Sequence, residues 1–231
     1  MRTKLIVLLI LILQIGVFGQ QGTFEGVDDS KINSWLPKLE IEYQAVYHFG
    51  NSEWESNLIL ICGFDKWYAQ IVSGQWSDDG KAWIRQYETL NNVRVKGNKF
   101  YSDKTNGEFV CYDTEQKRIK GLKVYKSWSG DDGYEIGYLS HSVSQEYSGK
   151  YPQASLRQLD IDELQRMSKN DLMIMRNEIY ARYGFIFKSG GMMDIYFKKQ
   201  NWYNGQHDDV TNFLTGLEKE NIKLIQQIEN K

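Results

Sequence analysis

Residues 57–72 read NLILICGFDKWYAQIV, and this stretch sets the pattern for the first half of the chain. Two runs that are rich in β-branched and aromatic residues, 57–62 and 66–72, flank a turn that contains Gly63. Short runs of this composition on either side of a glycine are typical of antiparallel strands joined by a short connection. We therefore predict two adjacent β-strands here.

The same pattern continues in both directions along the chain. Apolar and polar residues alternate at the start of 39–49, as they do in a strand with one buried face. Further runs follow at a spacing of roughly ten residues and show no helical periodicity. These runs cover 81–87, 92–95, 99–102, 108–112 and 118–125, and turn-forming residues at 50–52, 78–80, 96–98 and 105–107 lie between runs.

About eight short strands without intervening helices predict an antiparallel β-domain over residues 39–150. A barrel and a sandwich-like meander are both compatible with this pattern. We favour a barrel slightly, because closure removes exposed strand edges. Residues 127–155 form a transition, in which one or two edge strands are compatible with residues 134–139.

Helical periodicity begins in the last third of the chain. Ser168 opens a helix through a capping box, and Gly184 stands where a left-handed residue ends that helix. A last helix starts near Thr215, with Glu218 as its capping-box partner. Residues 151–231 are therefore predicted to form a small, mainly α-helical domain, which makes the fold class α+β.

The N-terminus has the pattern of a secretory signal peptide. A short basic segment precedes an apolar run in residues 1–19, and this run is shorter than the roughly twenty residues that span a bilayer. Cleavage is expected between Gly19 and Gln20, and residues 20–38 then form an N-terminal lead-in. We predict a secreted, periplasmic or cell-envelope protein without a transmembrane span in its mature form. The alternative is an uncleaved anchor.

Cys62 and Cys111 are the two cysteines of the chain, and each lies in a strand-like apolar run. In an oxidising compartment they can form a disulfide that closes a loop of about fifty residues and stabilises the fold by about 3–4 kcal/mol. The alternative is two separate buried thiols that pack as small apolar groups. The sequence leaves both alternatives open.

The segment Tyr180-Ala181-Arg182-Tyr183-Gly184 resembles the signature of the YARHG domain, a bacterial module usually found in exported proteins. The resemblance covers roughly residues 151–229 and includes Trp202-Tyr203 and Asn221-Ile222. The family usually has histidine where this chain has Tyr183, so any proton or metal chemistry of that histidine is missing here. The resemblance implies an extracytoplasmic role and some co-occurrence with peptidases, without an established activity.

Five residues of this module are the candidate binding residues: Arg182, Glu178, Asn177, Trp202 and Tyr203. Glu178 precedes Arg182 by four positions, the favourable spacing for a helical ion pair. One interpretation is a buried polar network, with Asn221 as a further member, that locks the helices against the Trp202-Tyr203 turn. The other is an arginine-centred cleft for a carboxylate or phosphate. We favour the structural interpretation, because no second charge-reading residue is evident nearby.

Catalytic, metal and cofactor motifs are missing from the sequence. It contains no zinc-protease helix, nucleophile elbow, phosphate-binding loop or paired-cysteine motif. The three histidines, His48, His141 and His207, lie in unrelated contexts, so we predict no catalytic residues, no metal and no cofactor. The net charge of −2 argues against a nucleic-acid partner.

The composition supports one functional hypothesis for the β-domain. Aromatic residues make up 14% of the chain, enough to form a stacking surface for sugars or peptides as well as a core. We expect Trp67 and Trp83 in the core, whereas Trp54, Trp76 and Trp128 lie near turns and are candidates for such a surface. The leading prediction is an exported, non-catalytic protein that binds an envelope protein, a peptide or a glycan. The alternative is an envelope hydrolase, peptidase-like or glycan-acting, with a site between the two domains.

Overall fold

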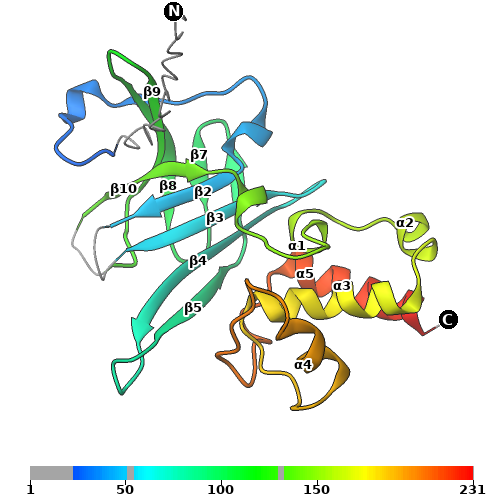
Figure 1. Cartoon of the computed structure of the whole chain (residues 1–231). Coiled ribbons are helices and arrows are strands. Elements are labelled where there is room, and N and C mark those ends of the chain that lie inside the picture. Colours follow the sequence, from blue (N-terminus) through cyan, green and yellow to red (C-terminus); the bar gives the residue numbers. More distant parts are fainter. Residues whose placement is uncertain (1–22, 51–54, 130–132, 231) are drawn as a thin grey trace, which may run out of the picture.

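The computed structural model describes residues 23–50, 55–129 and 133–230 (Figure 1). The predicted signal peptide and Trp54 lie outside the described residues. The predicted α+β class is confirmed: an antiparallel sheet is followed by a group of helices. Within the described ranges, no helix has both the length and the apolar character needed to cross a bilayer.

The β-domain is one curled antiparallel sheet that forms a half-barrel (Figure 1). Each of the eight predicted strands has a counterpart in it. The order across the sheet is β5-β4-β3-β2-β10-β9-β8-β7-β6, and β1 pairs with β8. The bounds are β1 (Asn33–Ser34), β2 (Ala45–Phe49), β3 (Ser56–Cys62), β4 (Trp67–Trp76), β5 (Trp83–Leu90), β6 (Arg94–Lys96), β7 (Lys99–Tyr101), β8 (Asn106–Asp113), β9 (Arg118–Val124) and β10 (Glu135–His141). The barrel is incomplete, because β5 and β6 are the two ends of this order.

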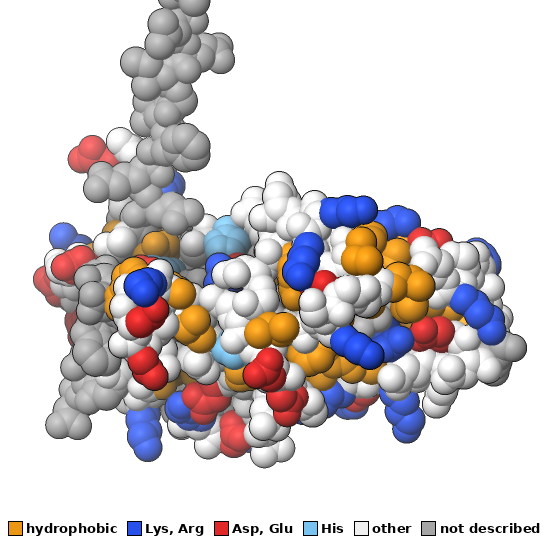
Figure 2. Space-filling model, turned by 60° about the horizontal axis from the view of Figure 1, so that its bottom comes forward, with side chains coloured by type: hydrophobic (Ala, Val, Ile, Leu, Met, Phe, Trp, Pro, Cys, Tyr) orange, Lys and Arg blue, Asp and Glu red, His pale blue; other side chains and the backbone are white. Residues whose placement is uncertain are grey.

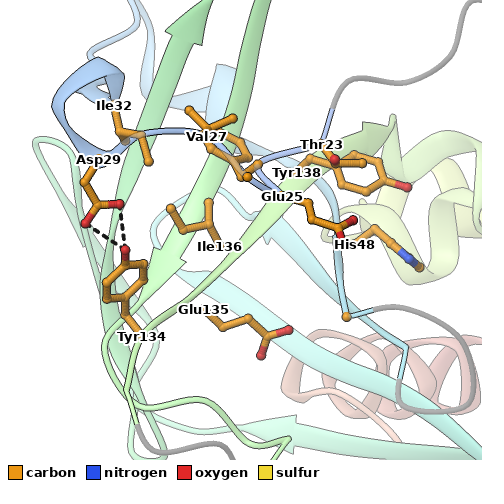
Figure 3. A pocket seen from close by; sticks show the side chains of 13 residues that line it. Thr23, Glu25, Val27, Asp29, Ile32, His48, Tyr134, Glu135, Ile136 and Tyr138 are labelled. Atoms are coloured by element: carbon orange, nitrogen blue, oxygen red, sulfur yellow. Dashed lines mark hydrogen bonds between the residues drawn. The ribbon is translucent and has the colours of Figure 1, made fainter.

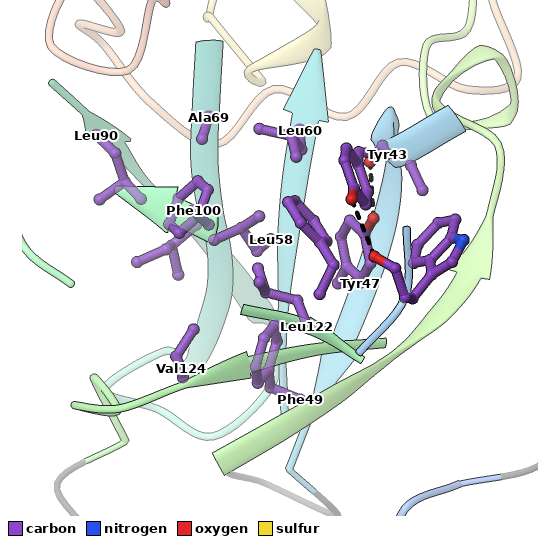
Figure 4. Packing of buried hydrophobic residues seen from close by; sticks show 14 of the residues in the cluster. Tyr43, Tyr47, Phe49, Leu58, Leu60, Ala69, Leu90, Phe100, Leu122 and Val124 are labelled. Atoms are coloured by element: carbon purple, nitrogen blue, oxygen red, sulfur yellow. Dashed lines mark hydrogen bonds between the residues drawn. The ribbon is translucent and has the colours of Figure 1, made fainter. Parts of the chain in front are cut away.

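The concave face of the sheet holds the main core (Figure 4). Alternate residues of β2 and β3, such as Tyr47 and Leu58, point into it and are fully buried. The rings of Tyr43 and Phe109 stack at 3.8 Å, which joins the two halves of the curl. The Tyr43 hydroxyl donates to the Trp35 carbonyl at 2.9 Å, so this buried polar group is satisfied.

Two expectations for the strands need correction. Residues Glu40–Tyr43 form a 3-10 turn, and β2 begins only at Ala45. Two backbone amides before this turn, those of Lys38 and Leu39, donate to the Glu42 carboxylate, which favours the turn over an extended chain. Residues 134–139 were expected at an edge, but β10 lies inside the sheet between β2 and β9.

The N-terminal lead-in packs against the convex face of the sheet. Phe24 lies over Gly121 of β9, where an added Cβ would come within 2.5 Å of the Phe24 ring. The Tyr134 hydroxyl donates to the Asp29 carboxylate at 2.6 Å, and a hollow of about 370 Å³ lies between the lead-in and β10 (Figure 3). Residues 23–34 thus cover part of the sheet rather than forming a free linker.

The helices form a module beside β3, β4 and β5 (Figure 1). The module comprises α1 (Gln153–Leu156), α2 (Ile161–Gln165), α3 (Lys169–Arg182), α4 (Met192–Phe197) and α5 (Gly216–Glu229). The predicted N-terminal signals are present: the Ser168 side chain accepts from the Asp171 amide, and Thr215 and Glu218 form a capping box. The module packs on the convex face of the sheet, where Val46, Ile59 and Val72 contact its Leu217 cluster.

Both cysteines are free thiols in the structure. Cys62 ends β3, whereas Cys111 is buried in β8, so they belong to different halves of the sheet. Of the two alternatives for the pair, the structure has separate thiols. Burial raises the pKa of both, which keeps them protonated and poorly reactive.

Candidate functional site

The motif Tyr180–Gly184 forms the last turn of α3 and the exit from that helix. Gly184 adopts the left-handed conformation with φ of 72°, as predicted. An added Cβ there would lie 2.8 Å from the Asn204 carbonyl oxygen, so the backbone of a second segment also requires glycine. The motif therefore fixes where the chain turns and what packs against the turn.

Arg182 and Glu178 form a buried ion pair that holds the segment before α1. The Arg182 guanidinium, 5% exposed, is 3.1 Å from Glu178 Oε2 and donates to the carbonyls of Ser148 and Tyr151 at 2.8 and 2.9 Å. Glu178 accepts from the backbone amides of Lys150 and Tyr151 at 2.8 and 2.7 Å. Burial lowers the pKa of Arg182, and the Glu178 carboxylate opposes that shift. Nearly all the hydrogen-bonding capacity of this arginine is used inside the protein.

Tyr183 points from the motif towards the sheet. Its hydroxyl donates to Glu218 Oε2 at 2.6 Å and lies 3.3 Å from Gln70 Oε1 on β4. The Tyr183 ring also meets Tyr87 of β5 edge-on, with centroids 4.8 Å apart. Burial raises the pKa of Glu218. The residue that departs from the family pattern is thus a contact between the two domains.

The helical module also covers the free edge of β5. The Gln206 side chain donates to the Trp83 carbonyl at 2.8 Å and accepts from the Arg85 amide at 3.3 Å, much as a neighbouring strand would. His207 Nε2 lies 3.0 Å from the Arg85 carbonyl. The side chains of Thr89 and Gln70 both donate to the carbonyl oxygen of Phe213 in the module. Face and edge contacts together bind the two domains into one unit.

A cleft of about 410 Å³ opens where β5, the motif and the segment before α1 meet. The β-domain contributes Trp83, Arg85 and Tyr87. These residues alternate along β5, so their side chains share the convex face. The segment before α1 contributes Gln145, Glu146 and Ser148, and the helical module contributes Ala181, Arg182, Gly184, Trp202, Asn204 and Gln206.

A smaller hollow of about 160 Å³ adjoins this cleft on the sheet. Trp83, Arg85 and Glu146 line both hollows, so the two form one groove across the convex face. Gly74 makes room for the Trp83 indole, because an added Cβ would lie 2.1 Å from its Nε1. Trp76, which is 53% exposed, meets Trp83 edge-on and extends this aromatic corner.

A larger hollow of about 980 Å³ lies at the open seam between β5 and β6. Two of its charged groups already have partners: Lys66 pairs with Glu220 at 3.5 Å, and Asp103 accepts from the Asn91 side chain at 2.8 Å. The Arg94 guanidinium lies over the Tyr101 ring. The motif does not line this hollow, so the cleft at the domain boundary is the stronger candidate.

The structure separates the predicted site residues into groups. Arg182 and Trp202 line the cleft, and Glu178 lies behind Arg182. The side chain of Asn177 donates to the Met173 carbonyl of its own helix at 2.7 Å. Tyr203 points into a satellite core and donates to the Phe185 carbonyl at 2.7 Å. The single network that we expected around the Trp202-Tyr203 turn is therefore wrong.

Asn221 belongs to a separate cluster. It accepts from the Leu159 amide and donates to the carbonyls of Ala154 and Arg157, which joins α5 to the connection between α1 and α2. The place of Asn221 in the fold explains why its hydrogen bonds lie outside the cleft. Asn221 lies on α5, and its partners lie on the chain that crosses that helix.

The β5 side of the cleft was not predicted from the sequence. Trp83 was expected in the core, but it lies half-buried over Gly74 on the convex face. The spacing of Trp83, Arg85 and Tyr87 shows that they share a face, yet only the docking of the helical module makes that face a wall of a cleft. Trp67 packs against the main core as predicted.

The lining residues determine the chemistry of the cleft. Burial raises the pKa of Tyr87 and lowers that of Arg182. Among the described residues, no group of three or more histidine, cysteine or acidic side chains is placed to hold a metal ion. Acidic, basic and hydrophobic side chains are interspersed over the face of the molecule in Figure 2. The cleft presents the indoles of Trp83 and Trp202, the exposed Arg85 and several side-chain amide groups.

Comparisons with known proteins agree with the motif. A search of curated proteins and a search of solved structures gave no significant match. Residues 149–230, which include the helices α1 to α5 and the cleft-lining motif, match the family model of the YARHG domain. The C-terminal part of this chain thus carries a YARHG domain, the module that its sequence predicted.

Proposed function

We propose that this protein is an exported, non-catalytic binding protein whose ligand occupies the cleft between the β-domain and the YARHG domain. The observation that carries the proposal is the cleft itself, because Arg182 and Gly184 of the motif line it together with Trp83 and Arg85 of the sheet. Ligand sites are often found where two domains meet. Export rests on the apolar N-terminal segment and on the usual occurrence of the YARHG domain.

The chemistry of the lining favours binding over catalysis. Indole rings such as Trp83 and Trp202 give a large contact area at little cost in side-chain entropy. Amide side chains such as Asn204 can hydrogen-bond to a peptide or a sugar. An envelope protein, a peptide or a glycan is therefore the proposed class of partner.

A cleft-filling variant tests the proposal. Asn204 is exposed at the rim, so Asn204→Trp places an indole in the opening without disturbing the core. Gln116→Trp adds the same bulk to the exposed β8–β9 turn and is the matched control. The mature protein and both variants are titrated with panels of envelope peptides and glycans by NMR. We expect binding by the wild type and by Gln116→Trp only. Absence of any ligand, or full binding by Asn204→Trp, contradicts the proposal.

One observation favours the alternative hydrolase. His141 lies between a hydroxyl and a carboxylate: its Nδ1 is 3.0 Å from Ser140 Oγ, and its Nε2 is 3.1 Å from Glu146 Oε2. This is the order of groups in a serine-nucleophile triad, and Glu146 lines the cleft. A fluorophosphonate probe decides between the two functions. Labelling of the wild type that is lost in Ser140→Ala supports the hydrolase, and absence of labelling removes it.

A further inference from the structure

The groove contains acidic groups that face histidines and an arginine, Arg85, that has no acidic partner among the described residues. Glu146 Oε2 faces His141 at 3.1 Å, and Glu55 Oε2 faces His48 at 3.8 Å, so each acidic group of the groove has one of its two oxygens against a histidine. Arg85 is exposed and makes no ion pair with any residue that the structure describes; its side chain interacts with the Tyr87 hydroxyl, which is not a counter-charge. A guanidinium in this position is available for an anionic group of a ligand.

Arg182, the other arginine that lines the cleft, is not free to bind an anion of the ligand. Arg182 is committed to Glu178, to two backbone carbonyls and to the Ser155 hydroxyl at 3.0 Å. Its role is to hold the cleft wall, because the segment that it binds carries Ser148. The anion-binding capacity of the groove therefore resides in Arg85.

The neighbours of Arg85 restrict which anion is suitable. Glu146 lines the same two hollows, and no ion pair joins it to Arg85 among the residues that the structure describes. The carboxylate of Glu146 repels a polyanion, whereas it attracts an ammonium group. Trp83, which also lines both hollows, offers an apolar surface next to this pair. A peptide supplies a carboxylate, an ammonium group and apolar side chains, but a neutral glycan supplies neither charge.

We infer that the groove binds peptides, with a carboxylate on Arg85 and an ammonium group towards Glu146. The inference rests on the proposed function and specifies its ligand. A free C-terminal carboxylate suits Arg85 because a guanidinium can bind both carboxylate oxygens at once. The Trp83 and Trp202 indoles contact the side chains between the charged ends.

The test compares ligands that differ by one charge. The probes are a tryptophan-free mixture of randomised tripeptides, its C-terminal amide form, its N-acetyl form, and chitotriose as a neutral glycan of similar size. Binding is measured through the intrinsic tryptophan fluorescence of the mature protein and by NMR. We expect the unmodified mixture to bind about tenfold more tightly than either blocked form, and chitotriose not to bind.

Two variants assign each charge. Arg85→Gln is expected to bind the unmodified mixture as weakly as the amide form, and Glu146→Gln as weakly as the N-acetyl form. Arg94→Gln removes an exposed arginine at the far end of the sheet order and is the control that keeps full affinity. Equal binding of all three peptide forms, or an Arg85→Gln variant with full discrimination, overturns the inference. Binding of chitotriose alone overturns the peptide assignment but keeps the proposed function, whereas an Asn204→Trp variant that keeps full peptide binding overturns the cleft.

Discussion

The Tyr183 hydroxyl donates a 2.6 Å hydrogen bond to the carboxylate of Glu218, and both residues are buried where the YARHG domain meets the sheet. Glu218 also accepts from the backbone amide of Thr215 at 2.9 Å, so one carboxyl group caps α5 and anchors the end of α3. Because Tyr183 also reaches Gln70 of β4, this pair connects two helices to the sheet. The substitution of tyrosine for the usual histidine therefore has a structural role in this chain.

Removing this hydroxyl should weaken the whole fold. We expect Tyr183→Phe to lower the free energy of unfolding by about 1–3 kcal/mol, because a buried carboxyl group loses a hydrogen-bond donor. Urea unfolding followed by far-UV circular dichroism measures the change. Tyr101→Phe, at an exposed position, is the control and should change the stability by less than about 0.5 kcal/mol. Equal stability of the wild type and Tyr183→Phe would show that the contact is not formed.

The pH dependence of stability should contain a contribution from Glu218. Burial raises the pKa of this carboxyl group above its ordinary value of 4.5, so the folded state holds the proton more tightly than the unfolded state. Its contribution is fully present below pH 4.5 and is lost as the pH rises through the folded-state pKa. We expect the wild type to lose stability relative to Glu218→Gln over this window, as measured by urea titrations at several pH values. Parallel pH profiles would refute this.

Asp171 should contribute in the opposite direction. The Tyr151 hydroxyl, Lys150 and Ser168 donate to its carboxylate at 2.6 to 2.9 Å and hold the pKa of Asp171 far below its ordinary value. This stabilisation is present above pH 3.8 and is lost as the pH falls towards the folded-state pKa. We expect Asp171→Asn to be less stable than the wild type at pH 7 and to approach it in acid. A constant difference from pH 7 to pH 2, in thermal unfolding, would contradict this account.

The Arg182–Glu178 pair should be important for stability. Arg182→Ala leaves the Glu178 carboxylate, 1% exposed, without its counter-charge, and we expect a loss of about 3–5 kcal/mol. Arg157→Ala breaks a half-exposed pair with Glu163 and should cost at most about 1 kcal/mol. Differential scanning calorimetry of the three proteins tests the prediction. An unchanged melting temperature for Arg182→Ala, together with lost ligand binding, would make Arg182 a ligand-binding residue instead.

The glycine under Trp83 offers a test of the groove without removing any of its functional groups. Gly74→Ala places a methyl group where the indole lies, so we expect displaced Trp83 fluorescence, weaker peptide binding and a stability loss of about 1–3 kcal/mol. Gln75→Ala, at the adjacent exposed position of β4, is the control. Unchanged fluorescence and binding in Gly74→Ala would place the indole elsewhere.

Local signals in the sequence were sufficient for the elements and insufficient for their assembly. The β-branched and aromatic runs around Leu58 and Ile71 identified strands, and Ser168 and Gly184 marked the ends of α3, because these preferences act over a few residues. The interior place of β10 depends on pairing with Tyr47, far away along the chain, and nothing near residue 139 encodes it. The cleft could not be predicted from the sequence for the same reason, since its walls come from segments that are far apart in the chain.

The place of β10 also has a consequence for the order of events during folding. Strands β2 to β5 and β6 to β9 each form from neighbours in sequence, so each meander can assemble as its residues become available. Their union must wait for the strand that ends at His141, because β10 is the strand that bonds to both β2 and β9 in the part of the chain that the structure describes. The pairing of β10 with β2 closes a loop of roughly ninety residues, which carries an entropic cost. The rate of folding should therefore be governed by the arrival of one late strand, and a nascent chain halted before it would hold two unjoined half-sheets.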